Sequence, residues 1–197
     1  MTQRLQLFLV PAMAAPILLA GALHLKAQTP VVLEHGDVTC HAYDKVTHSC
    51  ASITEITFMD EKTAILSGRS KQAFDTTNVD LEVKMEHVRV GERFCLSEKP
   101  WIVKTIPRND PGMAEFRSAL VETGKRYNAA NACTTIRTCG DQYVSLTASD
   151  GKIIKEMSGV FQLFKASDNK TASLRLRKIS NEAEAKQALY IPSEYTR

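Results

Sequence analysis

The segment Asn78-Val-Asp-Leu-Glu-Val-Lys-Met-Glu86 alternates apolar and polar residues along its length. Its apolar members, Val79, Leu81, Val83 and Met85, would all project from one side of an extended chain. A period of two residues is typical of a β-strand that buries one face and exposes the other. The segment therefore predicts a half-buried strand and, with it, a sheet-based fold.

Beyond Glu86 the apolar residues move to the other parity, at Val88 and Val90. A β-bulge adds one residue to a strand and would restore the alternation. We therefore predict a bulge near Glu86–His87. His87 would then be a packing or surface residue of the strand rather than a ligand.

Two turn-forming sequences, Met59-Asp-Glu-Lys62 and Ala148-Ser-Asp-Gly151, are each bordered by strand-like segments. The bordering segments are Ser52–Phe58, Thr63–Phe74, Tyr143–Thr147 and Lys152–Phe164. Asp150-Gly151 is the stronger turn signal, because this pair suits the positive φ angles of a tight hairpin turn. Antiparallel meanders are therefore predicted in both halves of the chain.

One segment between the meanders has helical periodicity. Asp110 can cap the free N–H groups of a first turn, and Pro111 suits the first helical position. Apolar or small residues then recur every three or four positions, at Met113, Phe116, Leu120, Gly124 and Tyr127. This spacing predicts an amphipathic helix over 111–128 that packs across a sheet. A second, short helix is predicted after Asn181 and before Pro192.

These elements predict a mainly β fold of the α+β class: antiparallel meander sheets, one amphipathic helix packed on a sheet, and a short C-terminal helix. The β-rich halves, residues 36–107 and 130–180, share turn residues at similar spacings. One hypothesis is that the halves are two similar β-subunits with one shared core. The alternative is that hairpin-rich segments share such residues by chance. In both cases residues 28–197 would form one β-rich domain.

The first residues have the pattern of a secretory signal. Arg4 precedes the apolar stretch Leu5–Ala22, and Ala20-Gly-Ala22 supplies the small side chains that a signal peptidase accepts. We expect residues 1–27 to form the signal peptide, with cleavage between residues 22 and 27. An uncleaved anchor helix is the alternative, which the prolines inside the apolar stretch disfavour. The exported chain would be periplasmic or secreted, with no stable membrane span.

The charge balance argues against nucleic acid as a partner. The 197 residues include 25 basic and 22 acidic side chains, for a net charge of +3. Arg4 and Lys26 lie in the expected signal, so the exported chain would be almost neutral. Nucleic-acid binding needs clustered positive charge. The basic residues of 165–178 are interpreted as a solvated strand edge.

All five cysteines lie beyond the expected signal. In an oxidising compartment such cysteines predict disulfides. Two close pairs stand out, Cys40 with Cys50 and Cys133 with Cys139, which would leave Cys95 as the odd thiol. The connectivity stays open, because Cys95 could instead pair with Cys50 or Cys139.

Three histidines, His35, His41 and His48, lie around the first cysteine pair. Imidazole and thiolate are ligands of zinc and copper. Their spacing matches no common metal module, so the main interpretation is a disulfide with solvent-facing histidines. A metal site that uses His41 and His48 is the alternative.

Cys95 is the candidate catalytic residue. Arg93, two positions earlier, would share its strand face and favour a thiolate. The alternative is a buried structural cysteine. The sequence contains no short diagnostic motif of hydrolases, nucleotide-binding proteins or haem proteins, and it predicts no cofactor.

These features favour an exported, disulfide-stabilised binding or interaction module whose partner is a protein or another envelope component. The first alternative is a small periplasmic enzyme with a site assembled from distant carboxylates or the Cys95 thiol. The second is a metal-binding protein that uses His41 and His48. Paired acids in a pocket, or a thiol beside a histidine, would favour the enzyme; an apolar patch or an unpaired sheet edge would favour the module.

Overall fold

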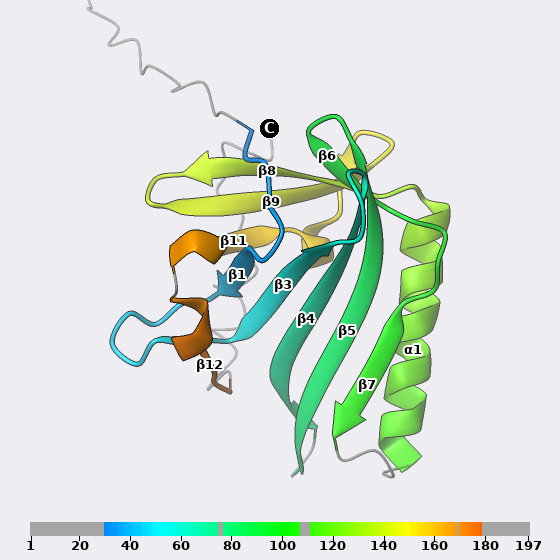
Figure 1. The fold of residues 1–197 in the computed structure, drawn as a ribbon. Coiled ribbons are helices and arrows are strands. Elements are labelled where there is room, and N and C mark those ends of the chain that lie inside the picture. Colours follow the sequence, from blue (N-terminus) through cyan, green and yellow to red (C-terminus); the bar gives the residue numbers. More distant parts are fainter. Residues whose placement is uncertain (1–29, 75–76, 107–110, 169, 179–197) are drawn as a thin grey trace, which may run out of the picture.

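The computed structural model describes residues 30–74, 77–106, 111–168 and 170–178 (Figure 1). Eight antiparallel strands form a closed barrel, which the pairing of β8 with β9 completes. In spatial order the strands are β9 (Gln142–Ser149), β11 (Gly159–Phe164), β1 (Val38–His41), β3 (Ser52–Phe58), β4 (Thr63–Phe74), β5 (Thr77–Val90), β6 (Arg93–Leu96) and β8 (Cys133–Cys139). The prediction of a mainly β, antiparallel fold with one helix is confirmed.

Shorter elements surround the barrel. Strand β7 (Ile102–Ile106) pairs with β5 outside the barrel circuit, and β10 (Lys152–Ile153) pairs with β9. Strands β2 (Ser49–Cys50) and β12 (Arg175–Leu176) form a separate parallel pair. Three single-turn helices complete the described chain: η1 (Lys155–Met157), η2 (Ala166–Asp168) and η3 (Thr171–Ser173).

The β3–β4 hairpin has the predicted strand limits. Asp60 holds its turn, because the Oδ1 atom accepts hydrogen bonds from the backbone N–H groups of Lys62 (2.8 Å) and Thr63 (2.7 Å). This local hydrogen bonding explains why an acidic turn sequence could be recognised from the sequence.

The second predicted hairpin is correct at its turn and wrong in its returning strand. Asp150 and Gly151 both have positive φ, as predicted for the turn. The expected strand 152–164 is divided, however, into β10, the η1 turn and β11. The hydroxyl of Ser158 accepts a hydrogen bond from the Thr147 N–H (2.9 Å) and donates one to the Ile154 carbonyl (2.8 Å). These side-chain bonds satisfy backbone groups that a continuous strand would have paired.

The predicted bulge near Glu86–His87 is absent from the β4–β5 pairing. The register runs without interruption from Thr63 opposite Val88 to Phe74 opposite Thr77. His87 takes the inward position instead, opposite Ala64, and is 3% exposed. The change of apolar parity therefore reflects a buried histidine rather than an extra residue. Strand β5 also changes partner near this point, from β7 to β6.

Helix α1 (Pro111–Ala129) confirms the predicted helix and lies beside β7 (Figure 1). Its buried residues include Met113, Gly124 and Asn128. The indole of Trp101, just before β7, packs against Gly124. The proposed cap Asp110, the short C-terminal helix and the signal peptide lie outside the described residues. No helix within the described ranges is both long and apolar enough to cross a membrane.

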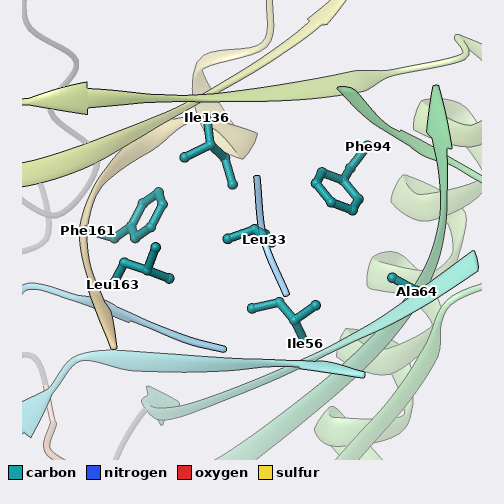
Figure 2. Close-up of a cluster of buried hydrophobic side chains, with 7 residues drawn as sticks. All are labelled: Leu33, Ile56, Ala64, Phe94, Ile136, Phe161 and Leu163. Carbon is teal, nitrogen blue, oxygen red and sulfur yellow. The ribbon is translucent and has the colours of Figure 1, made fainter. Parts of the chain in front are cut away.

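The barrel interior is a packed hydrophobic core. Figure 2 shows its buried side chains directed toward one another from several strands: Leu33, Ile56, Ala64, Phe94, Ile136, Phe161 and Leu163. Leu33 comes from the segment before β1, whose Val31 N–H donates to the Ile136 carbonyl (2.9 Å). A second cluster surrounds Cys40 and Cys50 and is covered by Leu174 and Leu176.

The first predicted disulfide, Cys40–Cys50, is present, and the second differs from the prediction. Cys133 is bonded to Cys95, its direct neighbour across the β6–β8 pair. Cys133 and Cys139 mark the two ends of strand β8. An extended chain rises about 3.3 Å per residue, which separates these ends by about 20 Å, far beyond the reach of a disulfide. The odd thiol is therefore Cys139 and not Cys95.

Candidate functional site

The disulfide removes the thiol on which the catalytic hypothesis for Cys95 depended. Disulfide sulfur cannot act as the thiolate nucleophile that such a mechanism requires. Arg93 pairs with Thr135 across the same strands and is exposed. The structure therefore gives no support to a reactive Cys95.

The three candidate metal ligands have different surroundings. The Nδ1 atom of exposed His35 accepts a hydrogen bond from the Phe58 N–H (3.2 Å), and that of exposed His48 lies 3.0 Å from the Tyr43 hydroxyl oxygen. His41 faces into the barrel, with its ring centroid 5.6 Å from that of Phe161. Within the described ranges, no group of three or more His, Cys, Asp or Glu side chains could hold a metal ion.

His41 departs from the prediction of a solvent-facing histidine. Burial lowers its pKa to about 4, and a hydrogen bond with the backbone of Val160 offsets only part of that effect. His87 behaves alike: burial lowers its pKa to about 4 against the opposing effect of a hydrogen bond with the Met85 backbone. Both rings are therefore neutral at pH 7.

One buried ion pair links the residue before β1, Asp37, to the residue after β11, Lys165. The Asp37 carboxylate, 0% exposed, accepts hydrogen bonds from Lys165 Nζ (2.8 Å) and from the N–H of Glu34 (2.9 Å). Burial by itself would lower the pKa of Lys165, but the hydrogen bond and charge of Asp37 outweigh it, so the pKa is raised. Each partner is satisfied within the chain, so the pair is structural.

A cleft of about 630 Å³ lies where β4 and β5 meet β7 and helix α1. This volume is within the range of small-molecule sites, about 300–1,000 Å³. We call it the β7 cleft. Its lining residues are Arg69, Ser70, Lys71, Asp80, Leu81, Glu82, Val103, Lys104, Thr105, Ile106, Arg117 and Leu176.

Three of the lining residues form a row across the sheet. Ser70 lies opposite Leu81, and Leu81 lies opposite Thr105, so their side chains project from one face. Along β4 and β5 the same parity leads to Ala64 and His87 inside the barrel. This face of the cleft therefore continues the inner surface of the barrel beyond its packed core.

Arg117 of helix α1 supplies a cation on that face. Its Nη1 atom donates a hydrogen bond to the hydroxyl oxygen of Thr105 at 2.6 Å. Thr105 is only 3% exposed, so this bond is partly shielded from water and fixes one edge of the guanidinium. The arrangement places a charged planar group beside the apolar side chains of Leu81 and Val103.

The cleft contains carboxylates, but not in the surroundings of a general acid. Asp80 is exposed, and Glu82 forms an ion pair with Lys84 (3.3 Å). General acids of hydrolases are typically buried and held in their protonated form. Asp80 and Glu82 are therefore weak candidates for the acid pair of an enzyme.

Sequence reasoning missed Arg117 and Thr105. A signal was present, because Arg117 lies four residues after Met113 and three before Leu120, within the predicted apolar face of the helix. A cationic residue in an apolar stripe indicates one of two arrangements. Either its charged end extends into solvent, or it makes a buried polar contact. The contact with Thr105 depends on how the helix sits on β7, which the local sequence does not contain.

Comparisons of the chain with protein-family models, with curated proteins and with solved structures find no match.

Proposed function

We propose that this protein is an exported, disulfide-stabilised binding module and that the β7 cleft is its ligand site. The observation that carries the proposal is the cleft itself, an open volume of about 630 Å³ next to a barrel whose interior is filled with side chains. A ligand excluded from the barrel by Phe94 and Phe161 could still contact the continuation of the same face.

Other features of β7 support an interaction role. Within the described residues β7 has a strand partner on one side, β5, and its Ile102 and Ile106 side chains are 56% and 69% exposed. Exposed large apolar side chains on a strand outside a closed barrel are typical of contact surfaces. Export is supported by the two disulfides, which persist in oxidising compartments.

The enzyme alternative has less support. Its candidate nucleophile is disulfide-bonded, and the carboxylates of the cleft are exposed or ion-paired. The metal-binding alternative lacks a ligand cluster within the described ranges. The described residues therefore support a binding module better than either alternative.

The proposal can be tested with an uncharged fluorescent probe, N-phenylnaphthylamine, titrated into the oxidised, mature protein. We expect saturable binding to one site. Leu81→Trp should fill the cleft and weaken binding by about tenfold or more. Val90→Trp is the matched control, because Val90 lies at the other end of β5 and is already 49% exposed.

The far-UV spectra of the variants establish that they are folded. If Leu81→Trp disturbs folding, Val103→Trp gives the same test, since Val103 also lines the cleft and projects from the same face. No binding by the wild-type protein, or equal binding by wild type and a folded cleft variant, would contradict the proposal.

A further inference from the structure

We infer that the side of β7 that faces away from β5, which we call the β7 edge, binds an extended segment of another protein. The segment would add to the sheet as a further strand and would carry, at alternate positions, an acidic residue between two apolar residues. This inference goes beyond the β7 cleft and assigns a second binding surface.

The first argument is the unpaired backbone of the β7 edge. Apart from the pairing with β5, the backbone of Ile102–Ile106 takes part in no hydrogen bond among the described residues. In an antiparallel strand, every second residue directs both its N–H and its C=O away from the neighbouring strand. These groups can pair with a further strand, which is the basis of recognition by strand addition.

The second argument is that helix α1 covers the inner face of β7 and not its outer face. Arg117 of the helix bonds to the side chain of Thr105, and Gly124 packs on Trp101, just before the strand. Residues of the opposite parity project from the other face of the sheet. In β7 these residues are Ile102, Lys104 and Ile106, and all three are exposed.

The helix also offers contacts to an added strand. Figure 1 shows α1 on the side of β7 that is away from β5, where such a strand would lie over the helix. Leu120 lies between Arg117 and Gly124 in the stripe that meets β7, yet it is only half-buried. Covering the rest of this apolar side chain would favour binding.

The third argument is the pattern of charge across the outer face of the sheet. Arg69 lies opposite Glu82, and Glu82 lies opposite Lys104, so the sign of the charge alternates from β4 to β5 to β7. Arg69 is already paired with Glu55 of β3 at 2.6 Å. Glu82 is paired with Lys84 at 3.3 Å, whereas Lys104 forms no ion pair within the described ranges. Opposite charges on neighbouring strands are stabilising, so an acidic residue is expected beside Lys104 on an added strand.

Lys104 also disfavours a second copy of this chain as the partner. Two-fold pairing that sets Ile102 opposite Ile106 of the other copy would place the two Lys104 side chains opposite each other. Like charges in this position destabilise a sheet, and lysine on an edge strand is a common device against self-pairing. A segment with an acid between two apolar residues covers the exposed isoleucines without this repulsion.

The test uses a fluorescein-labelled peptide, Thr-Ile-Thr-Glu-Thr-Ile-Thr, and measures its fluorescence anisotropy with the mature, oxidised protein. The peptide reads the same in both directions, so parallel and antiparallel addition are tested together. We expect saturable binding, and binding about tenfold weaker when lysine replaces the central glutamate. Lys104→Glu, shown to be folded by its far-UV spectrum, should reverse the order of the two peptides.

The matched control is Lys152→Glu. Lys152 is an exposed lysine on another short strand, β10, so its change should leave the order of the peptides intact. N-methylation separates strand addition from a contact between side chains alone. Methyl groups on one set of alternate peptide amides should abolish binding, and those on the other set should leave most of it, because only one set faces β7.

No binding of the glutamate peptide would overturn the inference, as would equal binding of both peptides or an order that Lys104→Glu leaves unchanged. Self-association of the protein that competes with the peptide would assign the β7 edge to a second copy and would overturn the choice of partner. Displacement of the peptide by N-phenylnaphthylamine would place it in the cleft, which is also contrary to the inference. Leu81→Trp should lose the dye and keep the peptide, so each probe tests its own site.

Discussion

Gly124 lies directly against the indole of Trp101. A Cβ atom on Gly124 would be 2.5 Å from Cδ2 and 2.6 Å from Cγ of that ring. The ring also lies 6.1 Å, centroid to centroid, from Tyr127, so it is held between the helix and the start of β7. The absence of a side chain at one helical position therefore sets how closely α1 approaches the strand that lines the cleft.

Gly124→Ala should lower stability, although alanine is the better helix former. The helical preference of Ala over Gly is worth about 1 kcal/mol. The added methyl group would overlap a large ring that has no flexible end to move, and overpacking of this kind costs about 1–3 kcal/mol or more. We expect a net fall in the free energy of unfolding, measured by urea denaturation.

Two further variants isolate the cause. Ser118→Ala, at an exposed position of the same helix, should not lower stability. Trp101→Leu should make Gly124→Ala much less costly in a double-mutant cycle. A Gly124→Ala variant as stable as the wild type would show that the helix does not rest on the ring.

Loss of the Cys95–Cys133 disulfide should cost more than loss of Cys40–Cys50. The bonds span 38 and 10 residues, respectively. Loop-closure entropy then gives about 4 kcal/mol for the longer loop and about 3 kcal/mol for the shorter. The double Cys→Ala variants, compared by urea denaturation under oxidising conditions, test this order. Cys139→Ala is the control and should change stability by less than about 0.5 kcal/mol.

Peptide mapping without reductant should find Cys139 as the alkylated cysteine. Cys95 should be linked to Cys133, and Cys40 to Cys50. The intact mass of the exported protein should correspond to cleavage between residues 22 and 27. A peptide linking Cys133 to Cys139, or a full-length chain that retains its leader, would be the contrary result.

Acid should destabilise the protein through His87. Burial lowers the folded-state pKa of His87 to about 4, from its ordinary value of 6.5. Between these two values the unfolded chain binds a proton that the folded chain does not, so stability falls as the pH falls through this window. The full effect is about 3 kcal/mol, at about 1.4 kcal/mol per pKa unit.

His87→Gln should remove the His87 share of this dependence, since Gln does not titrate, whereas His41, whose pKa is also lowered to about 4, keeps its own share. Denaturation midpoints at pH 7 and pH 4.5 measure the difference. His48→Asn is the control, because His48 is exposed and its positive φ suits Asn. The attribution to His87 fails if His87→Gln and wild type lose equal stability on acidification.

Local patterns in the sequence were sufficient to predict the β3–β4 hairpin and helix α1. The β3–β4 hairpin depends on period-two alternation and on Asp60, which bonds to backbone groups two and three residues away. Helix α1 depends on an apolar stripe with a period of three to four residues. Interactions of this range are contained within a short segment, so the segment alone reveals them.

Other features could not be read in this way. Sequence proximity suggested a disulfide between Cys133 and Cys139. These residues lie at opposite ends of strand β8, however, and strand pairing places Cys133 next to Cys95 of β6. Hydropathy suggested a bulge at His87, although the barrel buries that ring among apolar side chains. In both cases a partner distant in the sequence decides the outcome.

The sequence by itself determined that this chain forms antiparallel strands and one amphipathic helix, because those elements follow from hydrogen bonds and side-chain periodicity within a few residues. Three features were decided by the tertiary structure. The strands close into a barrel, Cys95 rather than Cys139 forms the disulfide with Cys133, and Arg117 meets Thr105 at an open cleft. These features depend on contacts between residues far apart along the chain, and only the packing of the whole chain sets such contacts.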